Sequence, residues 1–531
     1  MSVQKPKKVI IIGSGANRIG QGIEFDYACV QANNALKEIG IKSIMINSNP
    51  ETVSTDYDIS DRLYFEPTTP EYVFNVIKNE LNIVTDEGNL LDIYDSDPSS
   101  PIIAKYLQVA ITFGGQTSLN IRHLLKEKSI PFFGDCEEAI EICDNRESFE
   151  NFCQKLDIKR PKSFVCHNEK EIENAAKNFG YNFIIRPTSV IGGRGMSVIT
   201  SKEEYNEYLA IETSYLPCVI DEFLSSSKEF DIDIIKDKDG DILIAGIMEQ
   251  LEYAGVHSGD SASVLCDYEF AKENDIKDVA LKIVKNLNVV GAVNIQIAVR
   301  NDEIYVIEVN PRISRTLPFI AKSVKQPVVI FATKVMAGMT LKEVVKDVEF
   351  RENYITFKKR DLFYVKESVF SFNKIQSDVN LGPEMHSTGE VIGIGKTFNE
   401  AFIKSQIASG LNFKNNKIAV VSSDCLNDRF LDLIKKVTKI YKEIIVLNEN
   451  IQSFLSKNDI PSKLISDESF IKNNDIGLLL TFIKNPSSLD LIVRNIAILK
   501  KTPYSTNMET GELLVDAIDE FYKNNCKINV Y

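Results

Sequence analysis

The sequence lacks the cysteine spacing of a disulfide framework. Its nine cysteines are scattered over 531 residues, their number is odd, and no two of them have CxxC spacing. Small secreted proteins that depend on disulfides carry even numbers of cysteines at characteristic spacings. The pattern therefore indicates a reduced protein of the cytoplasm.

The amino terminus lacks a long hydrophobic segment. Only the apolar residues from Val9 to Ile12 separate a lysine-rich lead from Gly13. A signal peptide needs a longer apolar core, and a membrane-spanning helix needs about 20 apolar residues. We therefore expect no membrane targeting. Met1 directly before the lysine-rich lead favours a natural start over a fragment.

Positive charge is scarce in this chain. It has 61 Lys and Arg against 75 Asp and Glu, which gives a formal net charge of -14. This balance repels nucleic acid on average, but a phosphate site needs only a few placed cations, so ATP is not excluded. Hydrophobic residues make up 44% and charged residues 26%, as in globular proteins, and the length predicts about three or four domains.

The amino-terminal region alternates β-branched runs with helical periodicity, which is typical of a parallel sheet covered by helices. A strand at 8–12 leads into the turn Gly13-Ser14-Gly15, and a helix is expected at 25–39. Further strands are expected at 42–47, 109–113 and 131–133. The acidic stretch at 82–100 has no clear periodicity and is interpreted as a surface insertion.

The rest of the chain shows two further patterns, with a first boundary expected between 125 and 145. Strands separated by Gly-rich loops indicate a mixed α+β body from about 165 to 360, and strand and helix alternate again after 396. The predicted strands are 182–188, 218–223, 230–236, 242–248, 292–299, 303–309, 417–422, 443–447 and 476–481.

The most informative motif is NIQIAVRNDEIYVIEVNPRISRT, which begins at Asn294. Two alternating apolar runs flank a turn at 300–302, so a β-hairpin is predicted. Glu308 and Asn310 are two residues apart and share a face of their strand, and Gln296 can face the same side. Three such oxygen donors suit Mg²⁺.

Two arginines, Arg312 and Arg315, follow this hairpin and could neutralise the charge of a phosphoryl group in transfer. The alternative is a structural hairpin with a polar edge. That alternative is disfavoured, because three oxygen donors on apolar strands are costly to bury without a cation.

Gly-rich loops add weaker signals. RPTSVIGGRGM, from Arg186 to Met196, could wrap phosphate oxygens, although a hairpin turn explains its glycines about as well, and it is no Walker A loop. EQLEYAGVHSGDSAS, from Glu249, predicts an open loop in which His257 is more often structural than catalytic. GSGANRIGQGIEFDY, from Gly13, lacks GxGxxG spacing, so NAD is not expected, but a helix start there could hold an anion.

Together these segments resemble the large subunit of carbamoyl phosphate synthetase, specifically its second, carbamate-phosphorylating half. The resemblance covers some 390 residues in order. It rests on NRIGQGIEFDY (17–27), NSNPETVSTDYDISDRLYFEP (47–67), FGGQT (113–117), GGRGM (192–196), QLEYAGVHSGDSAS (250–263), NIQIAV (294–299), EVNPRISRT (308–316) and LGPEMHSTGEVIGIGKTF (381–398).

The resemblance implies a multidomain α/β fold with three parts: a Rossmann-like pre-ATP-grasp domain at 1–130, a two-lobed ATP-grasp domain at 131–395, and a divergent methylglyoxal-synthase-like domain at 396–531. It implies transfer of the γ-phosphoryl of ATP to carbamate, for pyrimidine and arginine synthesis. It also implies two Mg²⁺ or Mn²⁺ ions and raises K⁺ as a further ion. The implied partners are a separate first-half subunit and a glutaminase subunit, since one motif set cannot perform the whole reaction.

The site residues implied by the resemblance fall on matching positions of this chain. The nucleotide ligands are Arg186, Glu222, Leu224, Glu229, Gly255, Val256, His257, Ser258, Gln296 and Glu308; the metal ligands are Gln296, Glu308 and Asn310; and the catalytic arginines are Arg186, Arg312 and Arg315.

The sequence also departs from that family. A histidine is frequent where Glu222 stands, and after Phe398 the strings NENIQS and FIKNPSSLD replace Thr-rich phosphate loops, so allosteric control by a nucleotide is not expected. Two alternatives stay open. A different ATP-grasp ligase, such as a biotin carboxylase, would not be expected to carry NPETVSTDYD, and a silent ATP-binding scaffold would gain nothing from keeping the whole constellation.

Overall fold

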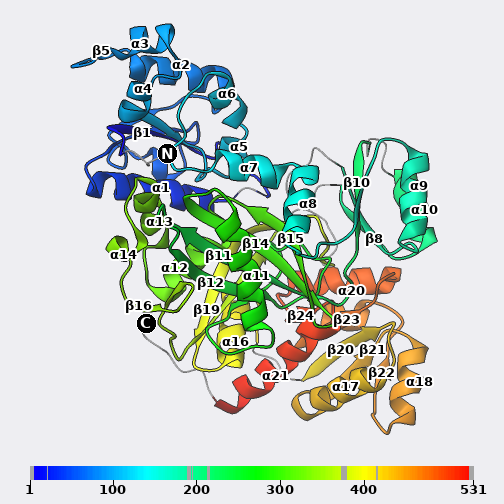
Figure 1. Ribbon diagram of the computed structural model, residues 1–531. Helices are drawn as coiled ribbons and strands as arrows, with labels where there is room; N and C mark the ends of the chain where they lie inside the picture. Colours follow the sequence, from blue (N-terminus) through cyan, green and yellow to red (C-terminus); the bar gives the residue numbers. More distant parts are fainter. Residues whose placement is uncertain are drawn as a thin grey trace. The chain divides into compact units, whose positions relative to one another are not determined.

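The computed structural model divides by its internal contacts into two compact units, and each is described by itself (Figure 1). Unit 1 comprises Met1–Ser163, Glu229–Glu249 and Tyr268–Arg360, and unit 2 comprises Phe164–Lys228, Gln250–Asp267 and Asp361–Tyr531. The structure describes residues 5–20, 22–187, 193, 195–211, 216–371, 380–413 and 417–524. Over these ranges, every helix is too short or too polar to cross a membrane.

The first sheet of unit 1 is parallel and has the strand order β3-β2-β1-β6. Its strands are β1 (Lys8–Ile12), β2 (Lys42–Ile46), β3 (Arg62–Tyr64) and β6 (Leu107–Ala110). The parallel sheet and its first two strands are therefore confirmed. The strand expected at 109–113 begins earlier, and the one expected at 131–133 is reduced to a bridge between Phe132 and Val109.

Helix α1 (Glu24–Glu38) confirms the helix predicted after the Gly-rich turn. Its first turn carries Glu24 and Asp26, whose negative charges interact favourably with the positive end of the helix dipole. Gly40 ends it with a φ of +71°, and the N–H of Ile41 donates back to the carbonyl of Leu36 at 2.9 Å. That backbone conformation is one that glycine adopts without steric cost.

The acidic stretch at 82–100 is more regular than expected. It forms a small hairpin, β4 (Val84–Thr85) with β5 (Gly88–Asn89), followed by helix α3 (Leu90–Ser96). The Asn89 side chain caps α3, and Leu90 and Tyr94 are buried. These two apolar side chains, four residues apart, are the helical signal that the sequence analysis missed. The other helices of this region are α2 (Pro70–Leu81), α4 (Pro101–Tyr106), α5 (Gly115–Leu119) and α6 (Arg122–Glu127).

The second sheet of unit 1 contains the predicted hairpin. Its strands follow the order β15 (Glu303–Asn310), β14 (Gly291–Arg300), β11 (Lys228–Lys236) and β12 (Ile242–Gln250). Strand β17 (Ile355–Phe357) pairs with β12, and β16 (Val348–Phe350) pairs with β17. The helices of this region are α7 (Glu137–Asp144), α8 (Arg146–Lys155), α11 (Glu273–Asn286), α12 (Thr316–Val324), α13 (Val328–Met336) and α14 (Leu341–Val344).

Unit 2 begins with a small sheet of order β7-β10-β8-β9. Its strands are β7 (Ser163–Cys166), β8 (Phe183–Pro187), β9 (Ser197–Ile199) and β10 (Cys218–Glu222), and its helices are α9 (Glu169–Asn178) and α10 (Lys202–Ile211). Helix α9 buries Ile172 and Ala176 against Phe183 and Ile185 of β8. Unit 2 also contains β13 (Ser263–Leu265), β18 (Phe363–Phe370), β19 (Ser387–Gly395) and α16 (Phe398–Ala408).

The carboxyl-terminal part of unit 2 is a five-stranded parallel sheet of order β22-β21-β20-β23-β24. Figure 1 shows α17 and α20 on opposite sides of this sheet, as in doubly wound α/β folds. Its elements are β20 (Ile418–Ser423), α17 (Asp428–Ile440), β21 (Glu443–Val446), α18 (Glu449–Lys457), β22 (Lys463–Leu464), α19 (Ser469–Asn473), β23 (Leu478–Phe482), α20 (Ser488–Leu499), β24 (Tyr504–Ser505) and α21 (Met508–Asn524).

A buried carboxylate joins the edge of the first sheet to helix α2. The Glu80 side chain, only 1% exposed, accepts hydrogen bonds from Lys8 at 2.8 Å, from Arg62 at 2.5 Å and from the Tyr64 hydroxyl at 2.7 Å. Burial opposes ionisation, but the hydrogen bonds from Lys8 and Tyr64 outweigh it and lower the pKa of Glu80 from its ordinary value. The native state therefore favours the ionised form of Glu80.

Replacing Glu80 by alanine should destabilise this domain by about 2–4 kcal/mol, because Lys8 and Tyr64 lose a buried acceptor. Since the folded pKa is lowered, this stabilisation is present above the unfolded value near 4.5 and is lost as pH falls through the folded value. Urea unfolding of wild type and Glu80→Ala at pH 7 and at pH 3.5 tests this.

The matched control is Glu87→Ala, which removes an ion pair to Lys105 whose partners are both well exposed. Exposed pairs contribute little, so its unfolding curve should nearly coincide with that of wild type. Equal shifts for both variants at pH 7 would contradict the role given to Glu80.

Candidate functional site

Strands β14 and β15 form the antiparallel hairpin that the sequence predicts. Asn301 and Asp302 make its turn with φ values of +50° and +64°, as type I′ turns require. Gln296 lies directly opposite Glu308, and Asn294 lies opposite Asn310. A bulge between Gln296 and Ile297 shifts the pairing, so that Ile297 faces Val306. Both of these last side chains are fully buried.

The predicted trio of Gln296, Glu308 and Asn310 lies on one face of this hairpin. Gln296 is held in place by Asp231, because its Nε2 donates to Asp231 Oδ1 at 3.1 Å. This bond leaves the carbonyl oxygen of Gln296 to contact another group. Asn310 Oδ1 accepts a hydrogen bond from Arg312 at 3.0 Å. A carbonyl oxygen has a second lone pair, so this bond orients Asn310 without excluding a cation.

The burial of the trio is less complete than the sequence suggested. Glu308 is exposed, and Gln296 and Asn310 are half-buried. A cation is therefore not needed to compensate for three deeply buried donors. The chemistry of the donors is the stronger argument, because carboxylate and amide oxygens are hard ligands. No cluster of three His, Cys, Asp or Glu side chains with metal-site geometry occurs in the described ranges, and the trio contains only one such residue.

Arg312 lies next to the trio and retains an unused donor. Besides Asn310, its guanidinium donates to the carbonyl of Ile313 at 3.0 Å and lies 6.0 Å from the centre of the Phe25 ring. Burial lowers the pKa of Arg312 from its ordinary value, whereas the charge of Glu308 opposes that shift. Its Nε is buried and has no hydrogen-bond partner among the described residues. An anion at this position would satisfy it.

Arg315 connects the hairpin to the loop that follows β1. It donates to the carbonyl of Gly20, and its Nε lies 3.8 Å from a carboxylate oxygen of Glu24. Both partners belong to the NRIGQGIEFDY string. The segment after β1, where the sequence suggested an anion site, therefore holds Arg315.

Sequence reasoning missed the acidic side of strand β11. Glu229 was predicted as a nucleotide ligand, but Asp231 and Asp233 were not singled out, although the three recur with period two in the strand. Asp231 orients Gln296, and Asp233 accepts from Thr316 at 2.5 Å and Asn294 at 3.3 Å. Burial raises the pKa of Glu229 to about 8 and that of Asp233 to about 6, and the charge of Asp231 adds to both shifts.

Unit 2 carries Arg186 and Glu222 on neighbouring strands. Arg186 lies opposite Val219, and its Nε is 3.0 Å from a carboxylate oxygen of Asp221. Glu222 lies opposite Phe183, which is buried in the small sheet's core. In an antiparallel pair, opposite residues share a face, so Arg186 and Glu222 lie on different faces of the sheet. The two predicted nucleotide ligands would therefore have to contact a nucleotide from different faces of this sheet.

The loop from Gly255 to Ser258 is held by several backbone contacts within unit 2. Gly255 has a φ of +106°, and a Cβ there would lie 3.2 Å from the Phe223 ring and 3.5 Å from Val198. The N–H of His257 donates to the carbonyl of Gly382 at 2.8 Å. The loop therefore packs against both β9 and the segment after β10. Leu224, also predicted as a ligand, is buried in that segment.

The His257 ring takes part in a contact within its own loop. Its Nδ1 accepts a hydrogen bond from the N–H of Gly259 at 3.0 Å, which closes a tight turn. Asp260 then accepts from the N–H groups of His386 at 2.7 Å and Ser387 at 2.9 Å. This fixes the loop to the LGPEMHSTGE segment. Val256 and Ser258 are half-buried in the same turn.

Only part of the Gly-rich loop RPTSVIGGRGM can be placed. Residues 188–192 and 194 lie outside the described residues. Gly193 has a φ of +75°, and a Cβ there would collide with the carbonyl oxygen of Pro383. The carbonyl of Gly195 accepts from the Tyr208 hydroxyl at 3.0 Å. Glycine at 193 is thus required by a close approach to the 381–388 segment.

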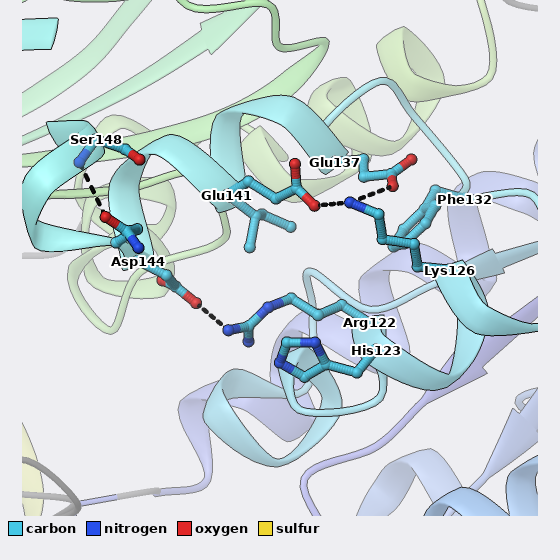
Figure 2. A pocket seen from close by; sticks show the side chains of 10 residues that line it. Arg122, His123, Lys126, Phe132, Glu137, Glu141, Asp144 and Ser148 are labelled. Atoms are coloured by element: carbon cyan, nitrogen blue, oxygen red, sulfur yellow. Dashed lines mark hydrogen bonds and ion pairs between the residues drawn. The ribbon is translucent and has the colours of Figure 1, made fainter.

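A pocket that sequence reasoning did not foresee lies within residues 122–148 of unit 1 (Figure 2). It has a volume of about 440 Å³ and mixed charge. Arg122 contacts Asp144 at 3.0 Å, and Lys126 contacts Glu141. Burial raises the pKa of Asp144, and the charges of Arg122 and Arg312 oppose this. Its two cations, Arg122 and Lys126, are outnumbered by the carboxylates of Glu137, Glu141 and Asp144, so the pocket does not favour an anionic ligand.

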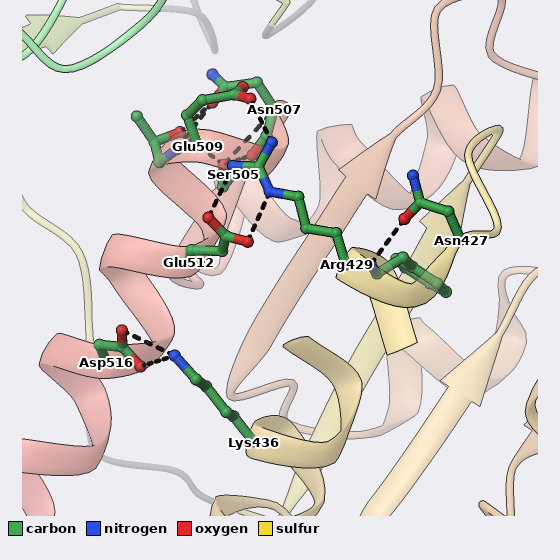
Figure 3. Close-up of polar contacts among 10 residues, drawn as sticks. Asn427, Arg429, Lys436, Ser505, Asn507, Glu509, Glu512 and Asp516 are labelled. Carbon is green, nitrogen blue, oxygen red and sulfur yellow. Dashed lines mark hydrogen bonds and ion pairs between the residues drawn. The ribbon is translucent and has the colours of Figure 1, made fainter. Parts of the chain in front are cut away.

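Ion pairs within the chain also occupy cations beside the last sheet (Figure 3). Arg429 of α17 forms a bidentate pair with Glu512, at 2.8 Å for each bond, and contacts Glu509 at 3.0 Å, both on α21. Lys436 contacts Asp516 at 2.7 Å. These ion pairs join helix α17 to helix α21.

Comparison with known proteins identifies two families of domain in the chain. Residues 5–142 match the model of the carbamoyl phosphate synthase preATP-grasp domain, and residues 145–344 match that of the ATP binding domain of the carbamoyl-phosphate synthase L chain. A solved structure, the biotin carboxylase domain of 2-oxoglutarate carboxylase from Hydrogenobacter thermophilus, shares the fold. Its TM-score is 0.53 with 15% identity, over 76% of this chain and 90% of that one.

Whole-chain relatives are considerably more similar in sequence. The carbamoyl phosphate synthase large chain, C-terminal section, of Aquifex aeolicus is 36% identical over 97% of this chain and 96% of its own length. The carbamoyl phosphate synthase large chain of Xanthomonas axonopodis is 35% identical over 96% of this chain but only 46% of its own length. The chain therefore belongs to the carbamoyl phosphate synthase large-chain family and aligns with that chain's C-terminal section.

Proposed function

We propose that this chain transfers the γ-phosphoryl group of ATP to carbamate and so forms carbamoyl phosphate, as an ATP-grasp ligase. The observation that carries the proposal is the β14–β15 register, which sets Gln296 opposite Glu308 beside Arg312 and its unused Nε. A silent scaffold would have no need of this arrangement. Family membership supplies the identity of the substrate.

The donor set fits Mg²⁺. Gln296, Glu308 and Asn310 would supply one carboxylate and two amide oxygens, and Asp231 and Arg312 orient the two amides. Mg²⁺ takes few protein ligands and completes its octahedron with phosphate oxygens and water. When bound with ATP, the cation neutralises phosphate charge and orients the γ-phosphoryl group. We assign no separate residues to Mn²⁺ or K⁺, and both stay secondary proposals.

The arginines act on the anionic partners of the reaction. A carbamate oxygen attacks the γ-phosphorus, the bond to the β–γ bridging oxygen breaks, and ADP leaves. The buried Nε of Arg312 would donate to an oxygen of the reacting group, and Arg315, held by Gly20 and Glu24, would add a second positive charge. Donors fixed before reaction stabilise the charge that develops in the transition state.

The nucleotide ligands of unit 2 act mainly through backbone groups. Glu222 and Leu224 lie where β10 ends, and Gly255–Ser258 form a tight loop with its own hydrogen bonds. Such segments present N–H and C=O groups at fixed positions, which suits recognition of an adenine edge or a phosphate. We assign Arg186 to the phosphates and infer that its guanidinium leaves Asp221 when ATP binds.

The remaining assignments extend this proposal. We place the domain boundaries near residues 130 and 395 and propose a methylglyoxal-synthase-like domain after them, a description that its five-stranded parallel sheet supports. A separate first section of the large chain and a glutaminase would supply carbamate. The product would enter pyrimidine and arginine synthesis.

The metal site is tested by Glu308→Gln. Loss of the only carboxylate in the trio should lower turnover by about 100-fold or more, with the fold unchanged, because the cation that orients the phosphoryl group is misplaced. The assay supplies carbamoyl phosphate with MgADP and measures ATP. No ATP from folded wild-type protein would overturn the proposed function.

Glu303→Gln is the matched control for that experiment. Glu303 lies on the same strand, but it is exposed and pairs with Lys159 and Tyr305. It should keep nearly all activity. Equal losses in both variants would mean that the hairpin, and not the metal position, is responsible.

The nucleotide loop is tested by Gly255→Ala. The added Cβ meets the Phe223 ring in a backbone conformation that alanine adopts poorly, so the loop must shift. We expect the KM for MgADP to rise by about tenfold in the same assay, which corresponds to about 1.4 kcal/mol of lost binding.

Gly240→Ala separates backbone strain from position. Gly240 also has a positive φ, +89°, but a Cβ there meets nothing within 4 Å. Both variants should lose about 1 kcal/mol of stability, yet only Gly255→Ala should change KM. An unchanged KM in Gly255→Ala would remove this loop from the nucleotide site.

A further inference from the structure

Three neighbouring strands of unit 1 carry polar side chains in two rows that cross the sheet. The first row contains Asp231 of β11, Gln296 of β14 and Glu308 of β15, and the second row contains Asp233, Asn294 and Asn310. In each row the amide of the β14 residue donates to the aspartate on one side and lies opposite a β15 residue on the other. An aspartate outside the predicted ligand set therefore flanks each of these amides.

Exposure to solvent increases along the first row. Asp231 is 4% exposed, Gln296 is half-buried and Glu308 is exposed. A cation or phosphate that enters from solvent thus meets the end of the row that holds Glu308 and Gln296, whereas Asp231 lies at the buried end. The position of Asp231 suits a residue that supports a ligand from the buried side.

The carboxylate of Asp231 determines which end of the Gln296 amide points toward it. An ionised carboxylate only accepts hydrogen bonds, whereas an amide has a donating nitrogen and an accepting oxygen. Asp231 therefore binds Nε2 of Gln296, at 3.1 Å. The reversed amide would bring two acceptor oxygens together and leave both without a donor. The amide oxygen of Gln296 is thereby kept available to another group.

The second row differs in what its aspartate supports. Asp233 accepts from Asn294 at 3.3 Å and from the Thr316 hydroxyl at 2.5 Å, which joins β11 to β14 and to the start of helix α12. Asn294 is only 2% exposed and is not a predicted ligand. Asp233, itself 2% exposed, thus lies as deep as Asp231, but its amide partner is structural.

We propose that Asp231 is a positioning residue for phosphoryl transfer, because it keeps the oxygen and not the nitrogen of the Gln296 amide available to Mg²⁺. The inference rests on the proposed function. Mg²⁺ takes oxygen ligands, and an amide nitrogen with its two hydrogens cannot replace one. Groups that orient a metal ligand change metal affinity by about 10- to 100-fold when they are lost. Asp231 thus contributes to metal binding without being a ligand.

The proposal predicts that the two side chains can exchange their chemical groups. In Asp231→Asn alone, the new amide can donate as well as accept, so the Gln296 amide is free to reverse and present its nitrogen. In the double variant Asp231→Asn/Gln296→Glu, the asparagine donates to one carboxylate oxygen and the other oxygen stays available to Mg²⁺. The double variant has the same net charge as wild type and side chains of the same shape.

The test measures ADP binding by isothermal titration calorimetry at a series of Mg²⁺ concentrations, at pH 8 and without turnover. Asp231→Asn should raise the Mg²⁺ concentration for half-maximal ADP binding by about tenfold or more, and the double variant should return it to within about threefold of wild type. ADP affinity in the absence of Mg²⁺ should be the same in all of these proteins, since Asp231 acts on the metal ligand and not on the nucleotide.

Asp233→Asn is the matched control, since it removes the same charge two residues away on the same strand. Asp233 is ionised at pH 8, because burial raises its pKa only to about 6. This variant should need about as much Mg²⁺ as wild type does. Its lost contacts to Asn294 and Thr316 should instead lower its stability, which urea unfolding measures.

Three results would overturn the positioning role: an unchanged Mg²⁺ requirement in Asp231→Asn, an equal increase in Asp233→Asn, or a double variant that is no better than Asp231→Asn. If Asp231→Asn does not fold, Asp231→Glu takes its place, because the longer acid displaces the amide and should raise the same Mg²⁺ requirement. ATP formation from carbamoyl phosphate and MgADP is measured on the same proteins. Wild-type protein that binds ADP with Mg²⁺ but forms no ATP rejects the proposed function and leaves the role of Asp231 standing.

Discussion

The pairing of β14 with β15 is the constraint on which the candidate site depends. Strict alternation from the buried Val306 would turn Glu308 toward the core. The bulge after Gln296 adds one residue to β15, so Val306 stays buried opposite Ile297 while Glu308 rotates out to face Gln296. The apolar packing of this sheet and the placement of its carboxylate are therefore compatible only with the bulge present.

Around that hairpin, three of the candidate side chains are held by neighbouring residues. Asp231 fixes the amide of Gln296, and Arg312 fixes that of Asn310. Gly20 and Glu24 hold Arg315. Such supporting contacts reduce the conformations open to the ligands, and so the free energy lost when a substrate orders them.

Sequence reasoning predicted the elements with strong periodicity and missed those fixed by tertiary contacts. The hairpin, α1 and the parallel sheets follow from alternation, helical spacing and glycine. Helix α3 was overlooked because its apolar pair, Leu90 and Tyr94, is surrounded by acidic residues. The bulge and the turned-out Glu308 could not be predicted, since they depend on how Ile297 and Val306 pack.

The sequence predicted only part of the candidate site, for a similar reason. Gln296, Glu308 and Asn310 were found from spacing, because ligand types recur with period two along a strand. Asp231 was not found, because a carboxylate on β11 gains its role only when β14 lies beside it. The same holds for the pairing of Arg122 with Asp144, which joins residues of two different helices.

The loops of unit 2 show how strings that are distant in the sequence contact one another. Gly193 fits only because no side chain separates it from the Pro383 carbonyl, and Asp260 binds the backbone of His386 and Ser387. Backbone contacts of this kind tolerate few substitutions, since a Cβ or a lost carboxylate displaces a whole segment. The three loops therefore form one structural element, in which the hydrogen bond from the His257 N–H to the Gly382 carbonyl joins the 255–258 loop to the 381–388 segment.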